Sequence, residues 1–192
     1  MRISFSGELG YEINVCANEA RQVWEALLAA GAKHGITPYG TETMHVLRAE
    51  KGFIIVGQDT DGSVTPVDLG MDWIIARNKD FIGRRSLLRS DTARGDRKHL
   101  VGLLTDDPQA VLPEGGQIVI DTKARPPVPM HGHVTSSYFS ACLKRSIALA
   151  LVTNGRNRMD EKVYVSLPGG RAIPAVITKP VFPDPDGALQ NV

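Results

Sequence analysis

Two adjacent residues near the start of the chain have side chains suited to binding a flat, nitrogen-rich ligand. Tyr11 and Glu12 follow the glycine-rich turn Ser6-Gly7-Glu8-Leu9-Gly10 and enter an alternating, strand-like stretch. A carboxylate in this position can accept two parallel N–H bonds from an amidine-like edge, such as that of a pterin or guanine, while Tyr11 forms a wall. The alternative is a solvated strand glutamate, which composition alone favours.

A second pair of charged residues, Arg48 and Glu50, lies two positions apart in a stretch with helical periodicity. Residues two apart on a helix do not face each other, so the pair is not one site. Taken alone, each side chain is expected to be solvated or to pair with a neighbour.

Other catalytic and metal-binding patterns are weak. Cys16 and Cys142 have no histidine nearby in the sequence, and a buried small side chain is the expectation for both. His131 and His133 would share one side of a strand, but no further Cys, Asp or Glu lies close by to complete a metal site. Phosphate-binding loops and a Gly-x-Ser-x-Gly elbow are absent from the sequence.

Composition narrows the function classes. The 192 residues carry 22 Lys+Arg and 21 Asp+Glu, and a net charge of +1 gives no electrostatic footprint for nucleic acid or an anionic membrane. The longest apolar run, 147–152, is far shorter than the roughly 20 residues of a membrane-spanning helix. Two cysteines do not make a disulfide framework, which favours a reduced, cytoplasmic compartment. The strand pattern begins by residue 2, which is typical either of a compact N-terminus or of a piece of a longer chain.

The elements that must position these residues change in character along the chain. Alternation predicts strands over 2–6 and 11–15, helical periodicity predicts helices over 18–33 and 41–51, and an apolar run predicts a buried strand over 53–57. A loop over 58–66 and a short helix over 81–88 follow, and the polar stretch 89–97 marks the best domain boundary.

Beyond this boundary, short strand-like runs separated by turn signals predict a small antiparallel barrel. The six runs cover residues 98–105, 117–121, 131–136, 146–153, 162–167 and 172–179. The Pro- and Asp-rich tail over 183–192 is expected to be frayed.

Five ordered segments resemble those of the aminomethyltransferase family, the glycine-cleavage T-proteins. Any one of them would be a weak signal, but their order over residues 2–150 is a strong one. Within that family, residues 40–52 and 56–62 are most similar to the α subunits of heterotetrameric sarcosine oxidases. The five segments are Arg2–Ile13 (RISFSGELGYEI), Leu47–Gly52 (LRAEKG), Gly57–Pro66 (GQDTDGSVTP), Lys79–Arg84 (KDFIGR) and Gly132–Ala150, which contains GHVTS and IALA.

The resemblance implies a fold class and a division of the chain. The fold is α+β: an α/β folate-binding subdomain (an antiparallel sheet with helices) followed by a small antiparallel β-barrel. Residues 1–95 form the second subdomain of the folate-binding region, 96–182 the C-terminal barrel and 183–192 the tail.

The resemblance also implies tetrahydrofolate as the cofactor and reverses the preference for a solvated Glu12. The family's matching glutamate hydrogen-bonds the pterin amidine edge, with Tyr11 as its neighbour. Met44 stands where T-proteins have a folate-binding arginine, and Arg48 is a further candidate for cofactor binding. The departure at Met44 favours the oxidase branch.

In intact oxidases of this kind, sarcosine is demethylated oxidatively to glycine. Its one-carbon unit passes to tetrahydrofolate or leaves as formaldehyde, and hydrogen peroxide forms. The catalytic aspartate and the FAD, FMN and NAD sites are expected outside this chain, which has no catalytic residue or metal site of its own and is expected to be inactive alone. The expected partners are the remaining part of the α subunit and the other oxidase subunits, and an apolar surface should promote self-association. The alternatives are a fragment of a T-protein or of a dimethylglycine dehydrogenase-type enzyme, or a non-catalytic assembly module.

Overall fold

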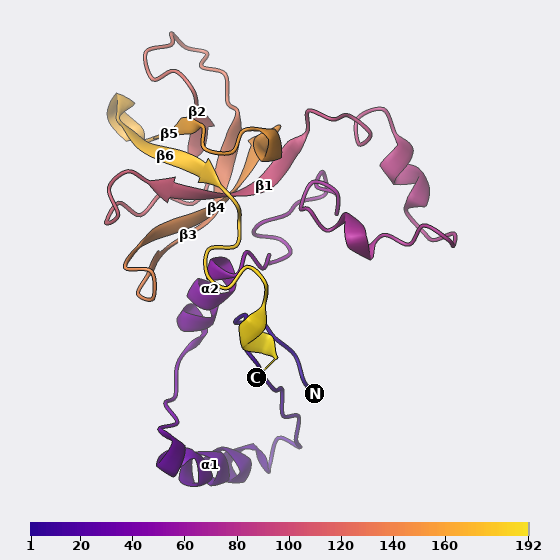
Figure 1. The fold of residues 1–192 in the computed structure, drawn as a ribbon, viewed down its shortest axis with the longest axis vertical. Helices are drawn as coiled ribbons and strands as arrows, with labels where there is room; N and C mark the ends of the chain where they lie inside the picture. Colours follow the sequence, from indigo (N-terminus) through magenta and orange to yellow (C-terminus); the bar gives the residue numbers. More distant parts are fainter. Residues whose placement is uncertain (192) are drawn as a thin grey trace.

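A computed structural model describes residues 1–191, and a closed barrel forms its C-terminal half (Figure 1). The helices are α1 (Ala20–Gly31) and α2 (Thr41–Glu50). The strands are β1 (Lys98–Thr105), β2 (Gln117–Val119), β3 (Gly132–Ser140), β4 (Arg145–Thr153), β5 (Lys162–Ser166) and β6 (Ala172–Thr178). Within the described residues, no helix is long and apolar enough to cross a membrane.

The barrel confirms the six strands expected from the sequence. Its strands follow one another in the order β1-β4-β3-β2-β5-β6, all antiparallel. Pairing of β1 with β6, where Gly102 lies opposite Thr178, closes the sheet on itself. Closure leaves no free edge in the barrel sheet, which removes a surface for unwanted strand pairing.

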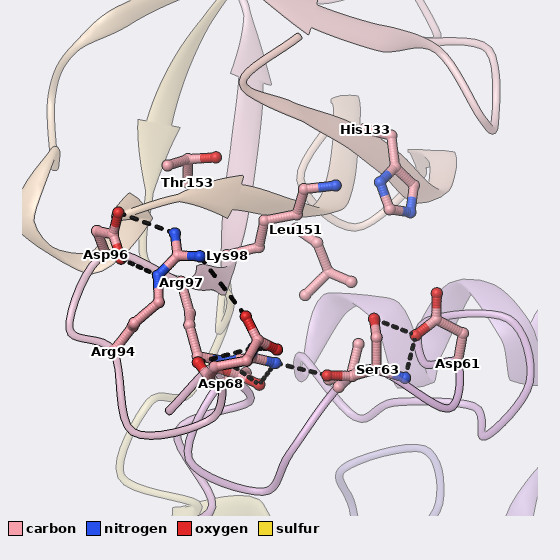
Figure 2. A pocket seen from close by; sticks show the side chains of 12 residues that line it. Asp61, Ser63, Asp68, Arg94, Asp96, Arg97, Lys98, His133, Leu151 and Thr153 are labelled. Atoms are coloured by element: carbon pink, nitrogen blue, oxygen red, sulfur yellow. Dashed lines mark hydrogen bonds and ion pairs between the residues drawn. The ribbon is translucent and has the colours of Figure 1, made fainter. Parts of the chain in front are cut away.

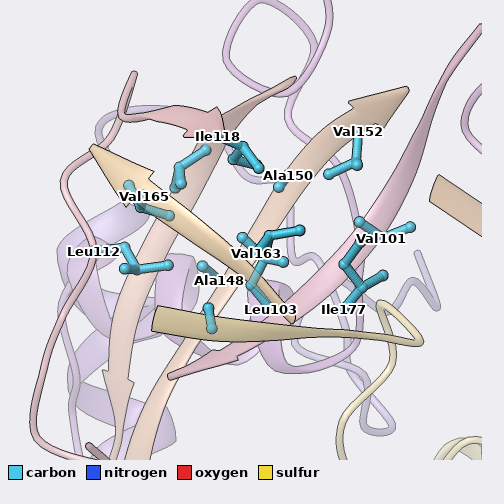
Figure 3. Close-up of a cluster of buried hydrophobic side chains, with 12 residues drawn as sticks. Val101, Leu103, Leu112, Ile118, Ala148, Ala150, Val152, Val163, Val165 and Ile177 are labelled. Atoms are coloured by element: carbon cyan, nitrogen blue, oxygen red, sulfur yellow. The ribbon is translucent and has the colours of Figure 1, made fainter. Parts of the chain in front are cut away.

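The barrel interior is filled by aliphatic side chains that alternate along the strands (Figure 3). On β4, Ala148, Ala150 and Val152 point into this interior, whereas the intervening Ile147, Leu149 and Leu151 belong to a second apolar cluster. Strand β4 is therefore covered on both faces, which explains why its sequence is continuously apolar rather than alternating.

The second apolar cluster joins the N-terminal half of the chain to the outside of the barrel. Ala49 on α2 packs there with Leu149 and Leu151 of β4, and Phe182 from the C-terminal segment adds to it. Helix α2 lies next to the barrel, but α1 lies far from it (Figure 1). No residue of α1 is buried, and its Trp24 is 53% exposed.

The fold class is confirmed, but the strands expected before the barrel are wrong. Residues 2–6 and 11–15 share only one isolated antiparallel bridge, between Arg2 and Tyr11. Residues 53–57 are irregular, and Val56 is 84% exposed rather than buried. A strand requires a neighbour along its length for its backbone hydrogen bonds, and in the described part of the chain these segments make only isolated bridges, Arg2 with Tyr11 and Val56 with Thr60. The helix expected over 81–88 is a short 3₁₀ helix, Arg84–Leu88.

The described part of the C-terminal tail, residues 183–191, is not frayed, contrary to expectation. The ammonium of Lys51 contacts the Asp184 carboxylate at 3.1 Å, and both side chains are largely buried. The Phe182 amide donates to the Glu50 carbonyl at 2.9 Å, and the Leu9 amide donates to the Leu189 carbonyl at 3.1 Å. These bonds tie the tail to the end of α2 and to the N-terminal turn.

Gly102 on β1 makes this arrangement sterically feasible. A Cβ atom there would lie 2.4 Å from the Lys179 carbonyl oxygen and 2.9 Å from the ring of Phe182. The chain leaving β6 therefore crosses β1 at a distance that only glycine permits.

Candidate functional site

Tyr11 and Glu12 lie on the exposed surface beside the N-terminus. The Glu12 amide donates to the Met1 carbonyl at 2.8 Å, and the Met1 ammonium donates to the Glu12 carbonyl at 2.7 Å. Tyr11 is 67% exposed. Within residues 1–191 the Glu12 carboxylate has no hydrogen bond or ion pair, so a fixed backbone presents an unengaged acceptor.

Met44 and Arg48, the other two candidates, lie one turn apart on α2. Met44 is half-buried, whereas Arg48 is completely buried. Arg48 is therefore neither solvated nor open to a ligand in this structure. Its guanidinium is directed toward the barrel and lies 5.8 Å from the ring centroid of Tyr138 on β3.

Asp59 is the charge partner of Arg48 and is also completely buried. Its Oδ2 accepts hydrogen bonds from Arg48 Nη1 at 2.5 Å and from the Ile55 amide at 2.8 Å. Its Oδ1 accepts from the hydroxyls of Thr135 at 2.5 Å and Ser136 at 2.7 Å. Four donors thus compensate the loss of hydration that burial imposes on this carboxylate.

Two further contacts complete this cluster. Arg48 Nη2 donates to Ser136 Oγ at 2.7 Å, and Gln58 Nε2 donates to the same oxygen at 3.1 Å. We name the cluster of Arg48, Gln58, Asp59, Thr135 and Ser136 the polar joint. It links α2, the loop after it and β3, and three of the five segments that carry the family resemblance meet in it.

Sequence reasoning missed the polar joint. Arginine and aspartate are rarely buried, so the sequence predicts an Arg48 that is solvated or pairs with a neighbour, and it gives no sign that the pair is completely buried. The available signal was that Arg48, Asp59 and Ser136 all stand inside the resembling segments. Glu50 is also buried rather than solvated, and its Oε1 accepts a hydrogen bond from the Ser140 hydroxyl at 2.5 Å.

A charged cavity of about 320 Å³ is lined by the loop after α2, by the polar stretch 89–97 and by side chains of β1, β3 and β4 (Figure 2). Arg97 bridges Asp68 at 2.9 Å and Asp91 at 2.8 Å across its wall. Burial opposes ionisation of Asp68, but hydrogen bonds from Arg97 and Thr65 outweigh it and lower the pKa of that carboxyl. Because Arg97 pairs with Asp68, this part of the cavity wall attaches the polar stretch 89–97 to the loop that carries Asp68.

The remaining histidines and cysteines form no cluster. Burial and the nearby Lys98 lower the pKa of His133, which therefore stays neutral at pH 7. Among residues 1–191 no group of three His, Cys, Asp or Glu side chains could hold a metal ion. The expectation that Cys16 and Cys142 are buried is wrong, because both are exposed, Cys16 in an irregular segment and Cys142 in a turn.

Comparisons with known proteins agree with this two-part architecture. The family model described as GCVT N-terminal domain matches residues 1–79, and the one described as glycine cleavage T-protein C-terminal barrel domain matches residues 98–184. In structure, the chain resembles the glycine cleavage system aminomethyltransferase T from Bartonella henselae, with a TM-score of 0.79 and 24% sequence identity. That match covers 94% of this chain and 48% of the other.

Curated relatives refine the comparison. The chain is 52% identical to sarcosine oxidase subunit alpha of Corynebacterium sp. (strain U-96), over 99% of this chain and 20% of the relative. It is 44% identical to the same subunit of Rhizobium meliloti, over 100% of this chain and 20% of the relative. It is 33% identical to the aminomethyltransferase of Thermotoga maritima, over 94% of this chain and 47% of the relative.

The two matched domains together cover most of the chain and define its class: the chain belongs to the glycine-cleavage T-protein family. Within that class, the predicted resemblance to sarcosine oxidase α subunits is confirmed by relatives that share about half of its residues. The chain spans about a fifth of the length of those relatives and nearly half of the length of the aminomethyltransferases.

Proposed function

We propose that the chain forms one wall of the tetrahydrofolate site of a sarcosine oxidase α-type protein. The observation that supports this is the Glu12 carboxylate, which is exposed and unengaged while its backbone is held by Met1. Two carboxylate oxygens match the two N–H groups of an amidine edge, and the exposed ring of Tyr11 is available beside them. The donor and acceptor pattern of this surface therefore fits a pterin.

In the whole protein, the proposed reaction is oxidative demethylation of sarcosine to glycine with formation of hydrogen peroxide. Bound tetrahydrofolate would accept the one-carbon unit, which otherwise leaves as formaldehyde. This chain would bind and orient the pterin through Glu12 and Tyr11. We place the catalytic residues and the FAD, FMN and NAD sites in other parts of the protein or its complex, so the chain alone would be inactive.

The same family likeness supports a second reading, in which the chain belongs to an aminomethyltransferase proper. Met44 favours the oxidase reading because it offers no charge to a folate carboxylate or ring nitrogen. We also propose that the chain assembles with the remaining part of its subunit and with further oxidase subunits, in keeping with its α-subunit relatives. A reduced, cytoplasmic location stays a prediction from the cysteine content.

Calorimetric titration of tetrahydrofolate tests the proposal. The parent chain is compared with Glu12→Gln and with the control Glu8→Gln, a change to an exposed glutamate in the same turn. We expect Glu12→Gln to weaken binding at least tenfold, about 1.4 kcal/mol, because one neutral amide oxygen replaces a bidentate charged acceptor. Glu8→Gln should bind as the parent does. Equal affinities for the Glu12→Gln variant and the parent, or no binding by the parent, would contradict the proposal.

A further inference from the structure

We infer that Arg48 is a positioning residue, and that its buried pair with Asp59 sets the place of helix α2 and of Met44, which stands where T-proteins have a folate-binding arginine. Sequence resemblance had made Arg48 a candidate for direct cofactor contact. Its side chain is 0% exposed, and both terminal nitrogens are engaged by protein groups. The part of this inference that concerns the ligand rests on the proposed function, whereas the part that concerns α2 stands on geometry alone.

The polar joint has little freedom to rearrange. Arg48 Nη1 donates to Asp59 at 2.5 Å and to the Phe53 carbonyl at 3.1 Å, while Nη2 donates to Ser136 at 2.7 Å. A buried charge that loses one of its partners has no water to replace it. Any rotation or translation of α2 would break several of these bonds together. The polar joint therefore fixes both the position of the helix and its rotation about its own axis.

The bonds of the joint hold only one end of α2. Arg48, Ala49 and Glu50 are buried, whereas residues 41–43 are exposed. The Glu50 carboxylate adds a bond to Ser140 on β3 at 2.5 Å. The helix is thus anchored through its last turn, and its first turns extend away from the anchor.

Met44 lies four residues before Arg48 and therefore on the same face of the helix. Because a helix transmits a rotation of its last turn to its first, the direction of the Met44 side chain follows from the position of Arg48. The structure thus connects the barrel, through Ser136, Asp59 and Arg48, to Met44, which stands where T-proteins have a folate-binding arginine.

The first experiment needs no ligand. The 192-residue chain is labelled with ¹³C at its methionine methyl groups, and the Met44 signal is assigned with Met44→Leu. We expect Asp59→Asn to shift or broaden the Met44 signal, because the charge partner of Arg48 is lost. Ser136→Ala, a milder change to the same joint, should do so too and provides the answer if Asp59→Asn does not fold.

A control separates positioning from simple loss of stability. Leu103→Ala removes a fully buried side chain from the barrel interior, away from the joint. It should lower the melting temperature and leave the Met44 signal in place. An unchanged Met44 signal in the Asp59→Asn or Ser136→Ala variant, or an equal shift in Leu103→Ala, would overturn the inference.

The second experiment is a double-mutant cycle on tetrahydrofolate affinity with Arg48→Met, Asp59→Asn and the double variant. If the pair acts through α2, each single change weakens binding about tenfold and the double change weakens it no further. If Arg48 instead contacted the ligand, Arg48→Met alone would weaken binding and Asp59→Asn would not, which would refute the positioning role. A parent chain that does not bind folate would refute the proposed function, while the methyl signals would still decide the role of the joint.

Discussion

Replacing Gly102 with alanine tests the close crossing of the C-terminal segment over the barrel. The added methyl group would lie 2.4 Å from the Lys179 carbonyl oxygen, 2.9 Å from Phe182 Cζ and 3.0 Å from Thr178 Cγ2. Normal carbon–oxygen contacts are longer, and the nearest atom belongs to backbone rather than to a flexible side chain. The segment after β6 must therefore move away from β1.

The size of the effect follows from these contacts. Overpacking of a tight site costs about 1–3 kcal/mol, and three close neighbours place this one in the upper half, about 2–3 kcal/mol. For a chain of this length each kcal/mol lowers the melting temperature by roughly 2–4 °C, so we expect a fall of roughly 4–12 °C. The displaced segment carries Phe182 and Asp184, so the tail should also become more sensitive to proteolysis.

Urea and thermal unfolding measure the loss, and limited proteolysis measures the release of the tail. Gly95→Ala is the matched control, because no atom lies within 4 Å of the added methyl group. That variant should be as stable as the parent or slightly more stable. A Gly102→Ala variant within about 0.5 kcal/mol of the parent would refute the steric argument, since ordinary surface changes have effects of that size.

Three further predictions concern charge and exposed surface. Asp59→Asn should lower the free energy of unfolding, measured in urea titrations, by about 3–5 kcal/mol, because Arg48 is left as an uncompensated buried charge. A loss under about 1 kcal/mol would contradict this prediction. Burial, helped by Arg156, holds the pKa of His99 below 6.5, so the unfolded chain takes up a proton first and stability should fall as pH decreases below that value. His99→Gln should flatten this dependence in unfolding curves from pH 7 to 5, and an unchanged slope would count against it. Trp24→Glu should reduce self-association through the exposed face of α1 in sedimentation velocity, and a parent that is monomeric at high concentration would rule out such association.

The barrel could be predicted from the sequence because each strand carries its own signal. The run from Ile147 to Val152 is apolar throughout, and the turn at Asn154-Gly155 ends it. The sequence did not reveal that β4 has two covered faces, because the cover on one face comes from α2, about a hundred residues earlier.

The prediction of strands before the barrel is wrong for the opposite reason. Alternation over 2–6 shows that neighbouring side chains differ in polarity, but it does not show that another strand lies alongside. The prediction of a frayed tail is wrong for a similar reason. Lys51 and Asp184 are 133 residues apart, so their ion pair leaves no local pattern in the sequence.

The candidate site was only partly accessible to sequence reasoning. Glu12 was selected because its chemistry and the family resemblance agreed, and its exposed, unengaged carboxylate is compatible with that choice. The burial of Arg48 could not be predicted, because it depends on partners from three separate segments, and no single segment reveals them.

The polar joint also constrains the order in which the chain can mature on the ribosome. Arg48 and Ser136 are separated by 88 residues, so α2 emerges before its partners on β3 have been synthesised. At typical elongation rates of 5–20 residues per second, that interval lasts roughly 4–18 s. Throughout it the Arg48 guanidinium lacks Ser136, and the last turn of α2 cannot complete its contacts until β3 exists. Helix α2 therefore takes its final position only after β3 has been made, and a nascent chain stalled before residue 136 would leave Arg48 without the barrel side of the joint.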